Sequence, residues 1–407
     1  MSFSFLGALF RRNNARRYQP EARFHPRGMA AVIIPAHNEA ALIERTLRSV
    51  LRAFHSADVY VFCDRCTDTT AEIARRYLPR INVIESQRQM GKSGGIEYVL
   101  RNYVEARNYL YVTIIDADTE IAPDYLTQIL PVVSRKDVAC AVGQVKSQWR
   151  KSNIISLYRT YVYALWQAIH KRFQGWTNSV TIASGCSTTW KVSVMSQLEF
   201  DHRLSTEDFD LTIQVHRKHL GRIAYVHKAV VWTQDPFTIA TYRKQMQRWV
   251  RAWWEVVRKH KLGLRIVRVQ SGRIRGLSAI DLITALLTAG IISSIALLAS
   301  IVLGPLLLFH PVPMTIGPAR LDSRADIVWL MLWQWGAIVV PAILAAIFSR
   351  RILLLLVWPL FLLFMYIDVF VTIGAITSTL RSLYRRLPAS SATLPPSAWQ
   401  SPERRAS

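Results

Sequence analysis

Acidic side chains follow two short apolar runs, in positions where they could bind a cation or a nucleotide. Asp64 and Asp68 lie in CDRCTDTT after the run 58–63, and Asp116 and Asp118 form DAD at the end of the run 110–116. A hard divalent cation prefers carboxylate oxygens and keeps waters and phosphate oxygens as its other ligands, so DAD suits such an ion bound to a phosphate. Two aspartates that cap the helix expected from residue 123 are the alternative interpretation.

A lysine lies among glycines in QRQMGKSGG. Lys92 and the backbone amides at a helix start would suit a diphosphate. The letters GKS match the end of a P-loop, but that motif needs a glycine six residues before the lysine, where this chain has Ser86. The glycines also follow Lys92 instead of preceding it. The sequence therefore does not indicate a P-loop nucleoside triphosphatase.

Two further acids open a helical stretch in LSTEDFDL, residues 204–211. Glu207 and Asp208 are either first-turn acids that favour the helix dipole, or one of them is a general base. A carboxylate near an acceptor hydroxyl can take its proton during nucleophilic attack. The residue types alone leave both interpretations open.

These residues need a scaffold, and the sequence predicts an α/β domain with a largely parallel sheet between residue 30 and about residue 235. The expected strands are 30–35, 58–63, 81–85 and 110–116, and the expected helices are 39–53, 70–78, 95–106 and 123–133. Ligands bind at the carboxyl ends of the strands in such sheets. We therefore expect the polar strand ends to form one site.

The net charge of +24 is concentrated in two basic clusters, one before Met29 and one from Arg243 to Arg275. Such clusters bind nucleic acid or an anionic lipid leaflet. Three apolar runs, 279–308, 327–348 and 352–376, each exceed the roughly 20 residues that cross a bilayer. They favour the leaflet and three spanning helices, and they exclude a soluble nucleic-acid-binding protein. Asp368 lies inside the third run, where it is either functional or close to the interface.

The N-terminal stretch SFLGALF is too short to span a bilayer and lacks a following cleavage site, so we expect an interfacial or flexible tail. Cys63 and Cys66 form a CxxC, but the sequence offers no second pair or His cluster that would complete a zinc site. We interpret both as reduced thiols.

The stretch YRKQMQRWVRAWW, residues 242–254, combines cations with tryptophans. At about 100° per residue, Met246 and Trp253 fall on an apolar side that suits the bilayer interface. Glu255 falls on a second side, toward water and headgroups. Gln245, Arg248, Trp249 and Ala252 form a third side, which a generic basic interfacial helix leaves unexplained.

The order of these motifs resembles the membrane-bound family 2 glycosyltransferases. PAHNE, the Asp64 loop, GKSGG, DAD, SGC (184–186), TED and QMQRW follow one another between about residues 30 and 260. The branch with the D, D, D, QxxRW pattern contains the chitin, hyaluronan, cellulose and poly-N-acetylglucosamine synthases. The resemblance implies a GT-A fold facing the cytosol, a UDP-sugar donor, Mg²⁺ or Mn²⁺, and inversion of the anomeric centre by a single displacement.

On the donor side, the resemblance implies a role for each matching residue. The PAHNE segment and Asp64 would hold the uridine, Lys92 the diphosphate, Asp116 the nucleotide, and Asp118, with Asp116, the metal. The PAHNE residues concerned are Pro35, Ala36, Asn38 and Glu39. Many relatives have two adjacent acids after the second strand, whereas Cys63 and Arg65 flank Asp64 here, so Asp68 stays open as the nucleotide ligand.

On the acceptor side, the resemblance makes Asp208 the general base, with Glu207 beside it in the TED motif. Gln245, Arg248 and Trp249 match QxxRW, in which Arg would stabilise the diphosphate and Trp would form the floor of the acceptor site.

Five regions are expected on this basis. Residues 1–28 form the basic tail, 29–240 the GT-A domain, 241–278 basic amphipathic interface helices, 279–380 about three transmembrane helices, and 381–407 a flexible tail. The expected protein is a multi-pass enzyme of the cell membrane with a cytoplasmic catalytic domain, membrane lipids as partners and no nucleic acid.

The expected reaction transfers sugar from UDP-N-acetylglucosamine or UDP-glucose to a growing polysaccharide. Addition of one sugar to a membrane lipid, as in ceramide glucosyltransferases, is the first alternative. This chain has only three expected spans and no apolar run before its catalytic domain, and that departure from the larger synthases makes the alternative a serious rival. An inactive carbohydrate-binding scaffold is an alternative from another class.

Overall fold

The computed structural model describes residues 28–148, 153–262, 314–316, 319–321 and 324–384. Its centre is an eight-stranded mixed sheet with the order β3-β2-β1-β4-β7-β6-β8-β5. The strands are β1 Ala30–Ala36, β2 Val59–Asp64, β3 Asn82–Ser86, β4 Tyr111–Ile114, β5 Thr119–Ile121, β6 Val138–Ser147, β7 Thr188–Lys191 and β8 Arg222–Thr233. The first four confirm the expected strands, and they are mutually parallel where they pair.

Parallel strands that are covered on both faces read as continuous apolar runs, which explains sequences such as AAVIIPA in β1. Successive residues of β1 alternate between two buried clusters. Val32 and Ile34 face one cluster, and Ala31 and Ile33 face the other. The sheet is therefore a layer between two apolar cores, and its carboxyl edge is the part left to polar residues.

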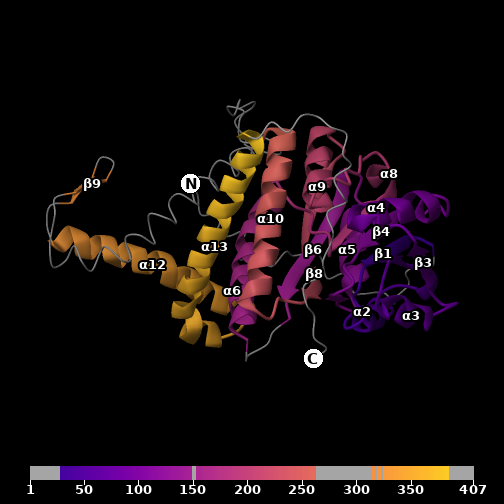
Figure 1. Cartoon of the computed structure of the whole chain (residues 1–407), viewed down its shortest axis with the longest axis horizontal. Helices are drawn as coiled ribbons and strands as arrows, with labels where there is room; N and C mark the ends of the chain where they lie inside the picture. The colour runs from indigo at the N-terminus through magenta and orange to yellow at the C-terminus, as the bar shows by residue number, and fades with distance from the viewer. Residues whose placement is uncertain (1–27, 149–152, 263–313, 317–318, 322–323, 385–407) are drawn as a thin grey trace.

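Helices cover both faces of the sheet. The first set is α2 Ile43–Val50, α3 Thr70–Arg75 and α5 Tyr125–Val133, and the second is α4 Gly91–Val99, α8 Val192–Met195 and α9 Glu207–Arg217. Figure 1 shows α2 and α3 on one side of the strands and α4 and α8 on the other.

One helix begins earlier than expected. The sequence predicted a helix over 95–106, but α4 begins at Gly91 and continues through a π-helical turn, η2 Leu100–Val104. Gly91 has φ +72°, which a glycine adopts without strain. Gly95 is required for packing, because a Cβ there would lie 2.4 Å from the Phe62 ring. The early start places Lys92 in the first turn of the helix.

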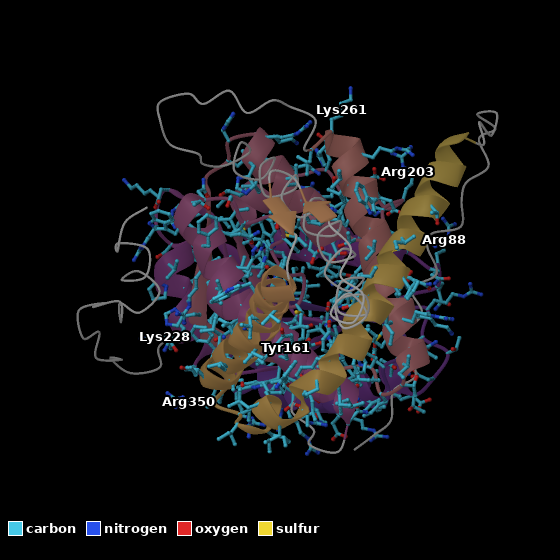
Figure 2. All side chains as sticks on the ribbon, turned by 90° about the vertical axis from the view of Figure 1, so that its left-hand side faces the viewer. Arg88, Tyr161, Arg203, Lys228, Lys261 and Arg350 are labelled. Atoms are coloured by element: carbon cyan, nitrogen blue, oxygen red, sulfur yellow. The ribbon has the colours of Figure 1, made fainter. Side chains whose placement is uncertain are left out.

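A layer of longer helices packs beside the sheet. It contains α6 Ile154–Leu165, its π-helical continuation η3 Trp166–His170, α7 Lys171–Thr177, α10 Ile239–His260, α12 Arg324–Ser349 and α13 Leu353–Tyr384. α10 lies between α13 and α9 (Figure 1). Lys261, just after α10, and Arg350, between α12 and α13, lie at opposite ends of this layer (Figure 2). A two-stranded ribbon, β9 Met314–Ile316 with β10 Ala319–Leu321, precedes α12.

Aromatic and aliphatic side chains join α6, α10, α12 and α13 into one further apolar cluster. Tyr158 of α6 stacks on Phe364 of α13 with ring centroids 4.8 Å apart, and Tyr242 of α10 meets the same Phe364 edge-on. α13 is therefore packed against the helix that carries QxxRW, and α12 packs against α6.

The expected membrane spans are only partly within the described residues. The run 279–308 lies outside them, and the runs 327–348 and 352–376 fall in α12 and α13. Among the described residues, no helix is long and apolar enough to cross a membrane. The expectation of three spanning helices is thus not supported by this part of the chain.

Candidate active site

Lys92 is the centre of a charged group at the carboxyl edge of the sheet. Its Nζ lies 2.7 Å from Asp116 Oδ1 and 3.0 Å from Glu207 Oε1. Desolvation works against the ammonium, but the charges of Asp116, Glu207 and Asp208 outweigh it and hold the pKa of Lys92 well above its usual range. Residues from α4, the β4–β5 turn and α9 thus meet around one permanent cation.

Asp116 and Asp118 lie in the turn between β4 and β5. Desolvation raises the pKa of Asp116 to about 6, Lys92 acts against that shift, and the charge of Asp118 adds to it. Within the described residues no group of three or more His, Cys, Asp or Glu is placed to hold a metal. Two neighbouring hard oxygen donors, one of which raises the pKa of the other, fit a divalent cation whose other ligands are waters and phosphate oxygens.

Asp64 anchors the start of α4. Its carboxylate accepts hydrogen bonds from the Met90 and Gly91 amides at 2.8 and 2.7 Å, which fixes the backbone just before Lys92. Asp68 accepts from the Thr70 and Ala40 amides and caps the neighbouring loop. Both acids are therefore engaged with backbone amides, and the choice between them as nucleotide ligand stays a prediction.

The PAHNE segment forms the wall beside these loops. Pro35 and Ala36 end β1. Asn38 adopts φ +55°, which asparagine tolerates better than most residues, and its Oδ1 accepts from the Thr67 amide at 2.8 Å. The amide of the buried Glu39 donates to Thr70 Oγ1 at 2.7 Å. The loops after β1 and β2 are thus tied to one another.

Asp208 is held in one orientation at the start of α9. Its Oδ2 accepts from the Gly185 amide at 3.0 Å, and its Oδ1 accepts from the Phe209 amide at 2.8 Å and from the Thr206 hydroxyl. A carboxylate has about four lone-pair sites. These three donors leave one lone-pair site free on Oδ2 of Asp208, and a proton could be accepted there.

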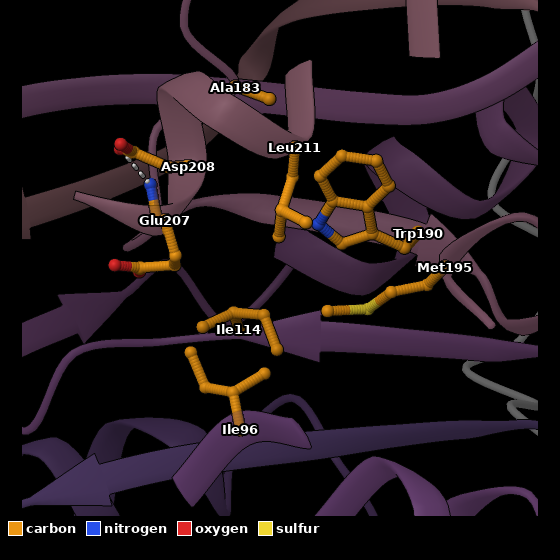
Figure 3. A pocket seen from close by; sticks show the side chains of 9 residues that line it. Ile96, Ile114, Ala183, Trp190, Met195, Glu207, Asp208 and Leu211 are labelled. Atoms are coloured by element: carbon orange, nitrogen blue, oxygen red, sulfur yellow. Dashed lines mark hydrogen bonds between the residues drawn. The ribbon is translucent and has the colours of Figure 1, made fainter. Parts of the chain in front are cut away.

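Apolar side chains back the two acids of α9. Figure 3 shows Ile114, Trp190, Leu211 and their neighbours beside Glu207 and Asp208, with the Gly185–Asp208 hydrogen bond dashed. Gly185, from the SGC motif, lies against the charged group, since a Cβ there would be 2.8 Å from Lys92 Nζ and 3.0 Å from Glu207 Oε1.

The QxxRW residues lie on α10. In the described part of the chain, no hydrogen bond or ion pair joins Gln245, Arg248 or Trp249 to Lys92, Asp116 or Glu207. Arg248 is exposed, and the Trp249 ring carries the guanidinium of Arg159 on its face, 4.7 Å from the centroid. Sequence reasoning missed Arg159, because it lies 90 positions before Trp249 in a stretch with no recognisable motif.

The second half of α10 braces α9, which corrects the expected helix faces. Trp253 stacks on Phe209 of α9, with centroids 4.6 Å apart, instead of facing a bilayer. Glu255, which is half-buried, accepts from the Ser205 amide at 3.0 Å, so it binds the loop before α9 instead of lying free in water as expected. Asp210 pairs with His260 at 2.7 Å and with Lys259 at 2.9 Å. α10 is a single helix that ends at His260, and the rest of the expected interface region lies outside the described residues.

Comparison with known proteins agrees with this geometry. The family described as "Glycosyltransferase like family 2" matches residues 26–252, more than half of the chain. The chain belongs to this family, and its resemblance to the family 2 enzymes is thereby confirmed.

Relatives include two proteins named poly-β-1,6-N-acetyl-D-glucosamine synthase. The one from Staphylococcus epidermidis is 26% identical over 247 residues, which cover 58% of this chain and 59% of the relative. The one from Staphylococcus aureus strain COL is 26% identical over 232 residues, which cover 55% and 54%. The chain thus matches less than two thirds of the length of either relative.

A solved structure shows the same fold. It is a mannosyltransferase from Pyrobaculum calidifontis in complex with GDP-mannose and Mn²⁺, with a TM-score of 0.51 and 16% identity over 84% of this chain and 88% of that one. The fold is therefore a GT-A-like α/β glycosyltransferase fold, as the sequence predicted for its catalytic region.

Proposed function

We propose that this protein is an inverting glycosyltransferase that moves a sugar from a nucleoside diphosphate to an acceptor hydroxyl. The observation that carries the proposal is the meeting of Lys92, Asp116 and Glu207 beside an Asp208 that the Gly185 amide holds in place. A cation for the diphosphate and a carboxylate for the acceptor then lie at one edge of a family 2 domain.

The proposed step is a single displacement. Asp208 accepts the proton of the acceptor hydroxyl, whose oxygen attacks the anomeric carbon while the bond from that carbon to the diphosphate breaks. Lys92 stays protonated and stabilises the negative charge that develops on the leaving diphosphate. Asp116 and Asp118 would hold Mg²⁺ or Mn²⁺, and such an ion would supply further positive charge at the same phosphate oxygens.

The remaining predicted site residues complete the proposal. Asp64 and the PAHNE residues would line the nucleotide base. Arg248 would add charge for the diphosphate, and Trp249, whose side chain is 37% exposed, would offer an aromatic floor to the acceptor. Glu207 would keep Lys92 aligned through their 3.0 Å contact.

We propose a UDP-sugar as donor and a growing polysaccharide as product. The names of the staphylococcal relatives support N-acetylglucosamine as the sugar. A lipid acceptor that receives one sugar is the second candidate. Exposed apolar side chains on α12 and α13 favour it, among them Trp329, Leu332, Ile347, Leu356 and Phe370.

The same exposed apolar side chains support a proposal about location. We propose that α12 and α13 attach the enzyme to the cell membrane and that the catalytic domain works on the cytoplasmic side. Arg350 and Arg351, between the two helices, suit anionic headgroups. Flotation of the full chain with anionic vesicles but not with neutral ones would support the arginine contribution, and failure to float with either would refute membrane attachment.

A nucleotide-release assay tests the reaction. The full chain, purified in detergent, is incubated with UDP-N-acetylglucosamine, UDP-glucose or GDP-mannose in the presence of Mg²⁺ or Mn²⁺. Long products support polysaccharide synthesis, and a lipid with one added sugar supports the second candidate. Release from GDP-mannose alone would overturn the UDP donor, and no release from any donor would refute transferase activity.

A further inference from the structure

Trp249 needs support from a neighbour if it is to present one fixed face to an acceptor. Its side chain is 37% exposed, so burial alone does not hold the ring. The guanidinium of Arg159 lies over the ring, with Cζ 4.7 Å from the centroid. A cation over an indole face is an attractive and directional contact. The orientation of Trp249 therefore depends on where Arg159 is placed.

Arg159 is itself placed by several groups. It is 4% exposed, it stacks 4.5 Å from the Tyr163 centroid, and its Nη2 donates to the Tyr163 hydroxyl at 2.6 Å. Its Nε lies 3.6 Å from Asp235 Oδ1. Asp235 also accepts hydrogen bonds from the hydroxyls of Ser147 and Ser156. A buried cation with a nearby carboxylate and two aromatic faces has little freedom to move.

The same region is tied to the C-terminal helix. Asp368 of α13 accepts from the hydroxyls of Tyr158 and Tyr242 at 2.7 and 2.6 Å. Tyr158 precedes Arg159 in α6, and Tyr242 lies one helical turn before Met246 on α10. Asp368, which the sequence left open as a functional or an interfacial charge, therefore joins α6 and α10, the two helices that carry Arg159 and Trp249.

We propose that Arg159 is a positioning residue for acceptor binding, which it controls by fixing the Trp249 ring. This inference rests on the proposed function, in which Trp249 contacts the acceptor. A purely structural arginine would act as the counter-ion of Asp235 and leave acceptor affinity alone. Lysine keeps that charge but cannot reproduce the planar stack or the bond geometry of a guanidinium, so Arg159→Lys separates the two roles.

The test measures binding, so that it does not depend on turnover. The dissociation constants of a tetramer of N-acetylglucosamine and of UDP are measured by calorimetry on the full chain in detergent. Arg159→Lys should weaken binding of the tetramer about fivefold, as expected when binding must order one side chain that the guanidinium no longer fixes, and it should leave the affinity for UDP unchanged. In a Trp249→Leu background the same change should have no further effect. Tyr163→Phe, which removes only the hydroxyl that holds Arg159, should weaken the tetramer by about twofold.

A matched control is available where Arg107 meets Tyr60 of β2. Arg107 lies over the Tyr60 ring at 5.6 Å and donates to the Tyr60 hydroxyl at 2.8 Å, so Arg107→Lys should leave tetramer affinity unchanged. Unchanged tetramer affinity in Arg159→Lys would overturn the inference. So would the same loss of tetramer affinity when the change is made in the Trp249→Leu background, or a loss of UDP affinity as large as the loss of tetramer affinity. If the wild type binds the tetramer but releases no nucleotide, only the proposed reaction is refuted. If the wild type does not bind the tetramer, the acceptor role of Trp249 is refuted and this inference with it.

Discussion

Gly185 lies against the Lys92–Glu207 pair, so an alanine there perturbs the donor side of the site without changing a charged group. The added Cβ would lie 2.8 Å from Lys92 Nζ, 3.0 Å from Glu207 Oε1 and 3.5 Å from Asp208 Cβ. The first two distances are too short for carbon, so the ends of two flexible side chains must move apart. The amide of residue 185 remains, so its hydrogen bond to Asp208 is kept.

The expected fall in kcat/KM follows from the opening of the contact between Lys92 and Glu207. Loss of a hydrogen bond to a charged group costs about 1.5–3 kcal/mol, and about 1.4 kcal/mol corresponds to a factor of ten in rate. We therefore expect Gly185→Ala to lower kcat/KM for the donor about 10- to 100-fold, with little change in acceptor KM. The assay is nucleotide release at varied donor concentration, with the melting temperature as a check on folding.

Gly374 in α13 provides the matched control, because a Cβ there would have no atom within 4 Å. Gly374→Ala should keep wild-type kcat/KM. A folded Gly185→Ala with wild-type kcat/KM for the donor would refute the view that the Lys92–Glu207 contact matters for the diphosphate.

Two further predictions concern pH and metal. Burial raises the pKa of Asp210, but hydrogen bonds from His260 and Lys259 outweigh it and lower the pKa below its usual value. The stabilisation that ionised Asp210 gives the folded state is therefore present above about pH 4 and is lost as the pH falls through the lowered pKa. In urea unfolding below about pH 4, the wild type should lose stability more steeply than Asp210→Asn. Parallel curves of unfolding free energy against pH for the two proteins would contradict this. Chelation with EDTA should stop nucleotide release and added Mn²⁺ should restore it, whereas undiminished release would exclude a metal at Asp116 and Asp118.

Much of the sheet could be predicted from sequence because buried parallel strands are continuous apolar runs. AAVIIPA and VYVFCD form β1 and β2 close to the expected bounds. Helix starts were less predictable, since they depend on side chains from elsewhere. α4 begins before the expected residue because the Asp64 carboxylate, 26 positions away, accepts from the Met90 amide.

The meeting of charged side chains at the sheet edge could also be predicted, because Lys92, Asp116 and Glu207 each lie near a strand end or a helix start. Their roles stay predictions. The residues that pack against the QxxRW helix could not be predicted from the sequence. An amphipathic pattern shows that Trp253 lies on an apolar side of α10 but not what covers that side, and Phe209 of α9 covers it instead of lipid. Arg159 meets Trp249 only through the packing of α6 on α10.

The central claim is that Asp208 takes the acceptor proton while Lys92 and its neighbours hold the diphosphate. The most direct test compares Asp208→Asn with Glu207→Gln, measuring UDP affinity by calorimetry and sugar transfer by product formation. We predict that Asp208→Asn binds UDP nearly as tightly as the wild type and transfers no sugar. Glu207→Gln, which loses the charge beside Lys92, should bind UDP with altered affinity and retain measurable transfer. Transfer by Asp208→Asn, or loss of transfer confined to Glu207→Gln, would contradict the assignment of the base.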